Sequence, residues 1–167
     1  MRKFWSTLVL MLLFVLGATW LPQSASESNV TLVSGTWASA GAVTFTSFVP
    51  AGPNARITGF AASKWSGQVA GNTTFTARVL QLARSGVLRG QLLETFTGSV
   101  QGVGSGTLTF VEQFVQNTTT GVLTISAEIT DGTGALSSLR GALHFTGGTD
   151  ARGLGDGAYT SRFTTSL

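Results

Sequence analysis

The chain has 167 residues, with ten Lys or Arg, seven Asp or Glu, one histidine and no cysteine. Two of the basic residues, Arg2 and Lys3, fall in an N-terminal leader, which leaves eight bases against seven acids and a net charge of +1. The eight are scattered rather than clustered, which argues against nucleic-acid binding, and the lone His144 with no cysteine argues against a metal centre.

The first 26 residues have the layout of a secretory signal peptide. A positive n-region precedes the apolar run 8–16, and small residues follow Pro22. Cleavage after Ser26 fits the small-residue rule, and the apolar run is shorter than the about 20 residues that a membrane-spanning helix needs. We therefore expect a signal peptide at 1–26, a single domain at 27–167, a secreted or periplasmic location, and no stable membrane span once the leader is cleaved. The alternative is a leader retained as a membrane anchor.

The rest of the chain predicts β-strands throughout, so the fold class is all-β. Thr, Val, Phe and Gly dominate, apolar and polar residues alternate, and there is no helical stripe. Turns rich in Gly, Asn and Pro separate the predicted strands, and such closely spaced strands are typical of an antiparallel barrel or sandwich. The strands are predicted at 30–37, 42–49, 55–62, 64–70, 73–82, 87–99, 107–116, 121–130, 139–146 and 157–166.

Glu94 and Glu112 each stand in the middle of an alternating face that is otherwise apolar. Their apolar neighbours on these two faces are Leu92, Phe96, Phe110 and Phe114. The hairpin must align one apolar face with the other, and a turn centred on Val103 satisfies this by placing Glu94 opposite Glu112. The Cβ atoms would then lie roughly 5 Å apart. The next hairpin, turning at 118–119, would place Glu112 opposite Ile125.

Two paired carboxyl groups on an apolar surface are expected to have raised pKa values and to titrate as a unit. Shared protonation would supply one acid and one base inside an apolar cavity, which is the functional interpretation. In the structural interpretation, each glutamate meets an Arg, a Lys or a backbone donor and only specifies the sheet. A register shift of two residues would make Glu94 and Glu112 diagonal neighbours instead.

Three segments resemble, in this order, a group of secreted bacterial domains of unknown function in the allene oxide cyclase and dirigent-like barrel superfamily. They are WSGQVAG at 65–71, ETFTGSVQGVGSGTLTF at 94–110 and GTGALSSLRGALHFTG at 132–147. The most specific parts are the spacing of Glu94 and Gly98 and the closing motif Gly-Thr-Gly-x-Leu-x-x-Leu-x-Gly at 132–141. Two positions depart from the group: Glu112 is often replaced there by a histidine or another polar residue, and Ala135 by an acidic one.

The resemblance implies an eight-stranded antiparallel β-barrel, allene oxide cyclase-like and calycin-like, whose interior holds a small apolar molecule. Related barrels include cyclases, and relatives form trimers or dimers, so a homo-oligomer is also an expectation. No residue matches the catalytic set of the plant enzymes, so the resemblance carries over no catalytic role.

Two classes of function follow. In the first, the secreted barrel binds a small apolar or amphipathic molecule; as an enzyme it would be a cofactor-independent isomerase or cyclase in which Glu94 and Glu112 exchange a proton. The residues expected to line the site are Leu92, Phe96, Phe110, Phe114, Ile125 and Trp65. In the second, the protein is a non-catalytic structural or interaction module whose barrel is filled by its own side chains. An interior cavity of several hundred Å³ would favour the first class.

Overall fold

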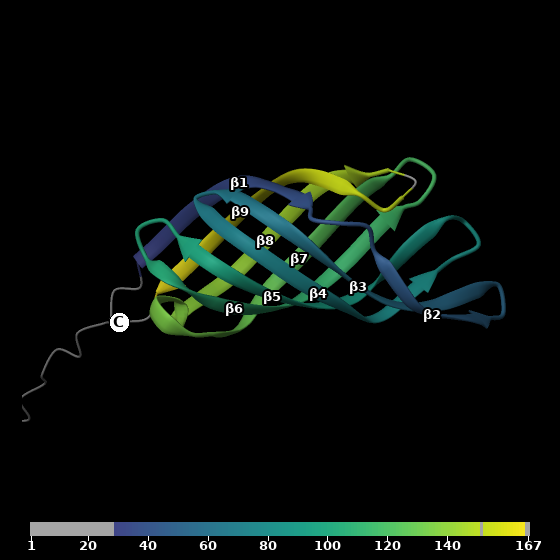
Figure 1. Ribbon diagram of the computed structural model, residues 1–167, viewed down its shortest axis with the longest axis horizontal. Coiled ribbons are helices and arrows are strands. Elements are labelled where there is room, and N and C mark those ends of the chain that lie inside the picture. Colours follow the sequence, from purple (N-terminus) through teal and green to yellow (C-terminus); the bar gives the residue numbers. More distant parts are fainter. Residues whose placement is uncertain (1–28, 151, 166–167) are drawn as a thin grey trace, which may run out of the picture.

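The structure, a computed structural model, describes residues 29–150 and 152–165, so the predicted signal peptide lies outside the described residues. Nearly all of the described chain is extended, in nine strands and one short 3₁₀ helix (Figure 1). The elements are β1 (Asn29–Ser39), β2 (Thr44–Ala51), β3 (Asn54–Gly67), β4 (Val69–Leu82), β5 (Val87–Val100), β6 (Gly104–Asn117), β7 (Val122–Gly132), η1 (Gly134–Leu136), β8 (Leu139–Thr149) and β9 (Gly155–Thr165). No helix in these two ranges is long and apolar enough to cross a membrane.

Eight of the strands close into an antiparallel barrel, which confirms the predicted fold. Neighbouring strands follow the order β1-β9-β8-β7-β6-β5-β4-β3, and a further pairing of β1 with β3 closes the ring. The strand β2 lies outside this ring, because it pairs only with the first half of β3. The β2–β3 and β4–β5 hairpins extend past one end of the barrel (Figure 1).

The predicted break between strands 55–62 and 64–70 is wrong, because β3 runs without interruption to Gly67. The turn follows at once, with Gly67 at a φ of +111°. The predicted turn around Gly71 lies inside β4 instead. Gly71 serves close packing there, since a Cβ at this position would lie 2.7 Å from the ring of Phe96.

The half of the barrel interior farthest from β2 is filled with side chains. The short helix η1 closes that end, and its Leu136 is fully buried. Above it Trp65 occupies the centre of an aromatic cluster, stacked on Phe96 with ring centroids 5.1 Å apart and packed at 5.0 Å from Phe145. Burial of such large side chains is the main source of stability in a chain without disulfides.

Tyr159 ties this packed half to the β3–β4 turn. Its hydroxyl oxygen accepts a hydrogen bond from the backbone N–H of Val69 at 2.9 Å, and its O–H donates to the Val69 carbonyl at 2.8 Å. The hydroxyl lies directly against Gly35 of β1, where a Cβ would be only 2.2 Å from it. A glycine is therefore required at this position for β1 to approach the ring.

Candidate functional site

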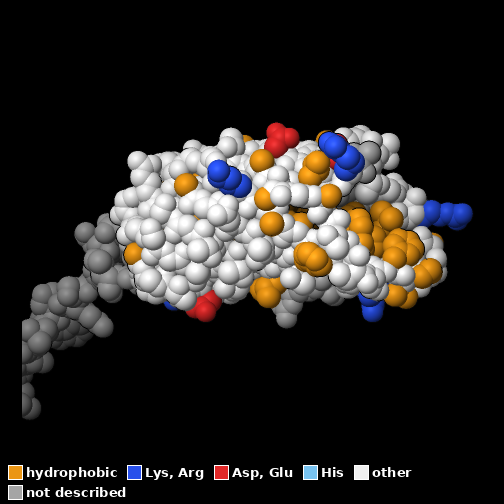
Figure 2. Space-filling view, in the orientation of Figure 1, with side chains coloured by type: hydrophobic (Ala, Val, Ile, Leu, Met, Phe, Trp, Pro, Cys, Tyr) orange, Lys and Arg blue, Asp and Glu red, His pale blue; other side chains and the backbone are white. Residues whose placement is uncertain are grey.

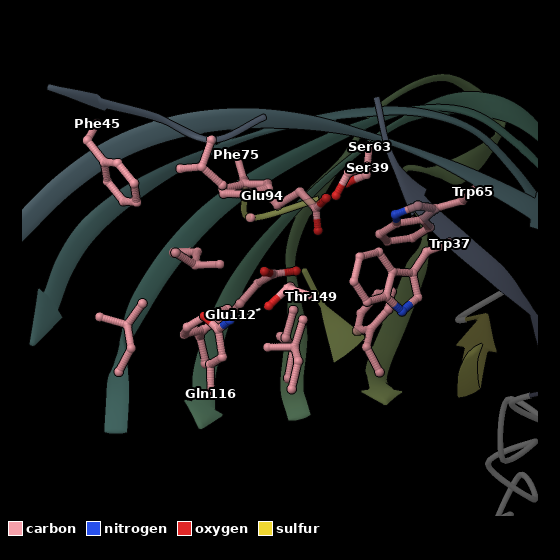
Figure 3. Close-up of a pocket in the computed structure, with 18 residues that line it drawn as sticks. Trp37, Ser39, Phe45, Ser63, Trp65, Phe75, Glu94, Glu112, Gln116 and Thr149 are labelled. Atoms are coloured by element: carbon pink, nitrogen blue, oxygen red, sulfur yellow. Dashed lines mark hydrogen bonds between the residues drawn. The ribbon is translucent and has the colours of Figure 1, made fainter. Parts of the chain in front are cut away.

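The other half of the interior, toward β2, contains a cavity of about 120 Å³. Trp37 and Trp65 lie at its inner end and Phe45 of β2 lies at the opposite side (Figure 3). Its wall is mostly apolar, with two glutamates and a few hydroxyl and amide groups. The lining residues are Trp37, Ser39, Val43, Phe45, Ser63, Trp65, Phe75, Leu88, Leu92, Glu94, Glu112, Phe114, Gln116, Leu123, Ile125, Phe145, Thr149 and Gly153.

Six of the eight predicted site residues line this cavity and two do not. Those that do are Leu92, Phe114, Ile125, Trp65, Glu94 and Glu112. Phe96 and Phe110 face the interior as expected, but they lie in the packed half, in contact with Trp65. The indole of Trp65 therefore separates the cavity from the filled part of the barrel.

The predicted pairing of Glu94 with Glu112 across the β5–β6 hairpin is wrong by two residues. Glu94 lies opposite Phe110, and Glu112 lies opposite Leu92. The turn is centred on Gly102, which has a φ of +78°, rather than on Val103. A left-handed conformation is costly for a β-branched residue and free for glycine, so the glycine takes the centre of the turn.

The β6–β7 hairpin also differs from its predicted register. Phe114 pairs with Ile125, and Glu112 pairs with Ala127 rather than with Ile125. In the turn, the side-chain oxygen of Asn117 accepts hydrogen bonds from the backbone N–H groups of Thr119 and Thr120, and Gly121 adopts a φ of +75°. This four-residue loop, 118–121, shifts the centre of the hairpin along the chain.

The diagonal register still brings the two carboxyl groups together. Glu94 and Glu112 are hydrogen-bonded to each other and point toward one another in the cavity (Figure 3). Both side chains are almost completely buried, at 3% and 1% exposed. The two carboxyl groups are thus diagonal neighbours, the arrangement that follows from a register shift of two residues, and not the predicted cross-strand pair.

Two buried hydroxyl groups continue this contact across the barrel wall. Thr73 of β4 donates a hydrogen bond to Glu94, and its Oγ1 lies 3.0 Å from the Oγ of Ser63 on β3. With Thr73 donating to the carboxylate, the Ser63 hydroxyl donates to Thr73. The side chains of Ser63, Thr73, Glu94 and Glu112 therefore form one polar row over four adjacent strands, which we call the polar ladder.

Burial raises the pKa of both glutamates, because an ionised carboxyl group loses its hydration in the apolar interior. The pKa of Glu112 is raised well above its ordinary value, since the negative charge of Glu94 and the hydrogen bond with it add to the effect of burial. For Glu94, the hydrogen bonds from Glu112 and Thr73 oppose the effect of burial on the pKa. The proton is therefore held on Glu112, which donates it to the Glu94 carboxylate.

The polar ladder leaves one acceptor free. Glu112 Oε1 is buried and has no hydrogen-bond partner within residues 29–150 and 152–165. No lysine or arginine is among the causes of the two pKa shifts, and the one ion pair of the described ranges, Arg152 with Asp150, lies in the β8–β9 loop. The structural interpretation requires a cation or a backbone donor at each glutamate. Among the described residues, neither kind of group is the partner of Glu94 or Glu112.

Sequence reasoning missed Ser63 and Thr73 because the strand and turn boundaries were misplaced. Read as one strand, 54–67 puts Ser63 on the same face as Ile57 and Trp65, and read from Val69, the β4 alternation turns Thr73 inward. With the correct strand boundaries, the periodicity of the sequence therefore predicts that both hydroxyl groups face the interior. His144 is exposed, and its Nδ1 lies 3.2 Å from the Ser126 hydroxyl. Within the described ranges, no three of His, Cys, Asp and Glu are placed to hold a metal ion.

Fold and site together define a small closed antiparallel β-barrel, half filled by its own side chains and half hollow, with a buried carboxyl pair in the hollow half. No family model matches the chain, and no curated protein matches its sequence. Solved structures do share the fold.

A protein of unknown function of the DUF3224 family from Shewanella oneidensis MR-1 is similar with a TM-score of 0.63 and 14% identity, over 83% of this chain and 100% of that chain. A pterocarpan synthase dirigent protein is similar with a TM-score of 0.52 and 13% identity, over 85% and 93%. These likenesses confirm the fold predicted from the resemblance, a barrel of the dirigent-like kind. At such identities they bear on the fold alone.

Proposed function

We propose that the barrel binds a small molecule with an apolar body and one hydrogen-bond donor, such as a hydroxyl or an ammonium group. The observation that carries this proposal is Glu112 Oε1, a buried acceptor that has no hydrogen-bond partner among the described residues and lies in a cavity with a mostly apolar wall. A buried polar atom left unpaired costs about 1–3 kcal/mol, and a ligand that donates to it recovers that cost. The apolar body would rest against Leu92, Phe114 and Ile125.

The size of the cavity restricts the ligand. At about 120 Å³ it is smaller than the roughly 300–1,000 Å³ of typical drug-sized sites. A ligand that places its donor on Glu112 therefore either is small or extends out of the barrel past Phe45. The hairpin of β2 and β3 continues the apolar wall beyond the barrel, because Phe48 lies on the same face as the buried Ile57 opposite it.

Intrinsic fluorescence gives a direct binding test. Past the predicted leader the only tryptophans are Trp37 and Trp65, and both line the cavity. We expect decanol and decylamine to change this fluorescence at about tenfold or more lower concentration than decane, because a hydrogen bond to a carboxyl group contributes about 1.5–3 kcal/mol. The Glu112→Leu variant should lose this preference, whereas Glu128→Gln, at an exposed position of β7, should keep it.

Equal responses to the three probes, or none at all, would contradict the proposal. Native mass spectrometry of the protein isolated from its own host supplies a second measurement, since a bound natural ligand would be retained as added mass. A barrel that carries no ligand and responds to no probe would support the alternative of a non-catalytic module with a filled core.

A second candidate function, a cofactor-independent isomerase or cyclase, is favoured by the shared proton of Glu94 and Glu112. The Glu94 carboxylate would accept a proton from one atom of a bound substrate while Glu112 donates its proton to another, and the hydrogen bond between the two carboxyl groups resets the pair. The synthase name of the dirigent neighbour is in keeping with such chemistry. With the retained molecule as substrate, Glu94→Gln should abolish conversion and preserve the fold; unchanged conversion would end this candidate.

A further inference from the structure

The β2–β3 hairpin exposes a concentration of large apolar side chains. Phe45, Phe48 and Val49 of β2 are 61%, 62% and 53% exposed, and Phe60 of β3 is 50% exposed. We call these four residues the apolar hairpin. Hydrophobic side chains gather at this end of the molecule in the space-filling view, with Lys or Arg side chains beside them (Figure 2). Exposed apolar clusters of this kind mark interaction surfaces.

The apolar side chains project from both faces of the hairpin. Phe48 lies opposite Ile57, whose side chain faces the interior, whereas Val49 lies opposite Arg56, which faces outward. Phe60 also faces outward, because it alternates with the interior residues of β3. A protein partner packed on one face would leave the other face in water. A medium that surrounds the hairpin covers both, and a lipid bilayer is such a medium.

The charged residues near the tips of the two projecting hairpins are all basic. Residues 29–93, which include both projecting hairpins, contain five Lys or Arg and no Asp or Glu. Arg56 lies beside Val49, and Arg84, in the β4–β5 turn, shares a shallow groove with Phe48. Both arginines are exposed. Apolar side chains flanked by cations are the combination that binds peripherally to anionic lipid surfaces.

From this geometry we infer that the apolar hairpin inserts into the surface of an anionic lipid bilayer, with Arg56 and Arg84 bound to headgroup phosphates. The docking itself does not depend on a ligand in the barrel. If the proposed function holds, docking also serves ligand binding, because Phe45 belongs both to the apolar hairpin and to the cavity wall. Docking would then place the cavity mouth against the bilayer, where amphipathic molecules with a single donor group are dissolved.

Flotation of the purified protein with vesicles tests the proposal. We expect it to float with vesicles of phosphatidylcholine mixed with phosphatidylglycerol, and much less with phosphatidylcholine alone. Phe48→Ser combined with Val49→Ser should lower the partition coefficient about tenfold or more, because both side chains leave water on insertion. Each of Arg56→Gln and Arg84→Gln should lower it about fivefold on anionic vesicles, and added salt should do the same to the unchanged protein.

Matched controls lie elsewhere on the barrel. Leu32→Ser removes an equally exposed apolar side chain from β1, and Arg162→Gln removes an exposed cation from β9, so neither should change the partition coefficient. The absence of flotation, or equal losses in patch and control variants, would overturn the proposal. So would a dimer in sedimentation that Phe48→Ser dissociates without any vesicle binding, because the apolar hairpin would then be an interface between copies of the chain.

Failure of docking and failure of the proposed ligand binding are separable. The variant that combines Val49→Ser with Arg56→Gln, two exposed residues that face away from the barrel interior, should keep the fluorescence response to decanol, and Glu112→Leu should keep vesicle flotation. Loss of only one activity in each variant would assign the two properties to two different parts of the barrel.

Discussion

The carboxyl groups of Glu94 and Glu112 are hydrogen-bonded to each other although neither residue is the cross-strand partner of the other. The positions opposite them hold Phe110 and Leu92, so each carboxyl group also has an apolar neighbour on the adjacent strand. This diagonal contact lets one proton bridge two acids while apolar side chains keep water from them. It explains why a sheet that is otherwise apolar inside tolerates two acidic residues.

The first expectation concerns the titration of this pair. In a carboxyl NMR titration of the folded protein, both glutamates should titrate above the ordinary value of about 4.3, with Glu112 the higher of the two. The curves should show two coupled steps, because the charge of one residue affects the pKa of the other. If Glu94 and Glu112 both titrate at that ordinary value, the buried pair does not exist in solution.

The raised pKa values also make the stability depend on pH. Between the unfolded and the folded pKa the native state holds more protons than the unfolded state, so the free energy of unfolding falls as pH rises through this interval. At pH values below the pKa of the unfolded state, these two groups no longer change the free energy of unfolding with pH. Each unit by which a pKa is raised corresponds to about 1.4 kcal/mol. Urea denaturation at a series of pH values from acid to neutral measures the effect.

The variant Glu112→Gln should weaken this pH dependence and raise the stability at neutral pH. Its amide N–H can donate to Glu94 as the protonated carboxyl group does, but it has no proton to lose. A slope that is the same in Glu112→Gln as in the unchanged protein would contradict the assignment of the proton to Glu112.

The hydroxyl of Thr73 is expected to hold part of the charge of Glu94. Thr73→Val keeps the shape of the side chain and removes the donor, which should destabilise the protein by about 1.5–3 kcal/mol when Glu94 is ionised and by less when it is protonated. The pKa of Glu94 should rise further, since the Thr73 hydrogen bond lowers it. Thr74→Val, on the outward face of the same strand, is the control and should change neither quantity. Equal effects of the two variants would exclude the hydrogen bond.

Periodicity predicted an antiparallel barrel or sandwich and the inward faces of β5 and β6, because burial on one side of a sheet requires alternation, whereas the choice of a closed eight-stranded barrel came from the resemblance. It placed Leu92, Phe114 and Glu112 at the cavity without knowledge of the register, since a shift of two residues preserves the face. The register itself depended on which turn residue adopts a positive φ. Gly102 and Val103 both lie between β5 and β6, and only the closed barrel decides which of them is the centre of the turn.

Two other features depended on contacts between distant strands. The split of the interior into a packed and a hollow half follows from how Trp65 stacks on side chains of β5, β6, β8 and β9, and no local pattern encodes that arrangement. Likewise, β2 alternates like any other strand, but its partner β3 pairs with β1 beyond Phe60, and this leaves β2 outside the ring. From the sequence alone, the phenylalanines of β2 would be predicted to lie in the core.

The approach of β1 to Tyr159 gives the sharpest test of how the barrel closes. In Gly35→Ala the new Cβ would lie 2.1 Å from the Ser66 carbonyl oxygen and 2.2 Å from the Tyr159 hydroxyl, and neither atom belongs to a side chain that can swing away freely. The backbone of β1 or β3 must shift, and the hydrogen bonds between Tyr159 and Val69 must lengthen. We expect a loss of about 1–3 kcal/mol in the free energy of unfolding, measured by urea denaturation.

Gly41→Ala has no atom within 4 Å of its new Cβ and should be nearly neutral. Because Gly35 pairs with Gly67 where β1 meets β3, a neutral Gly35→Ala would mean that these two strands are not held together in solution and that the barrel is open at this seam.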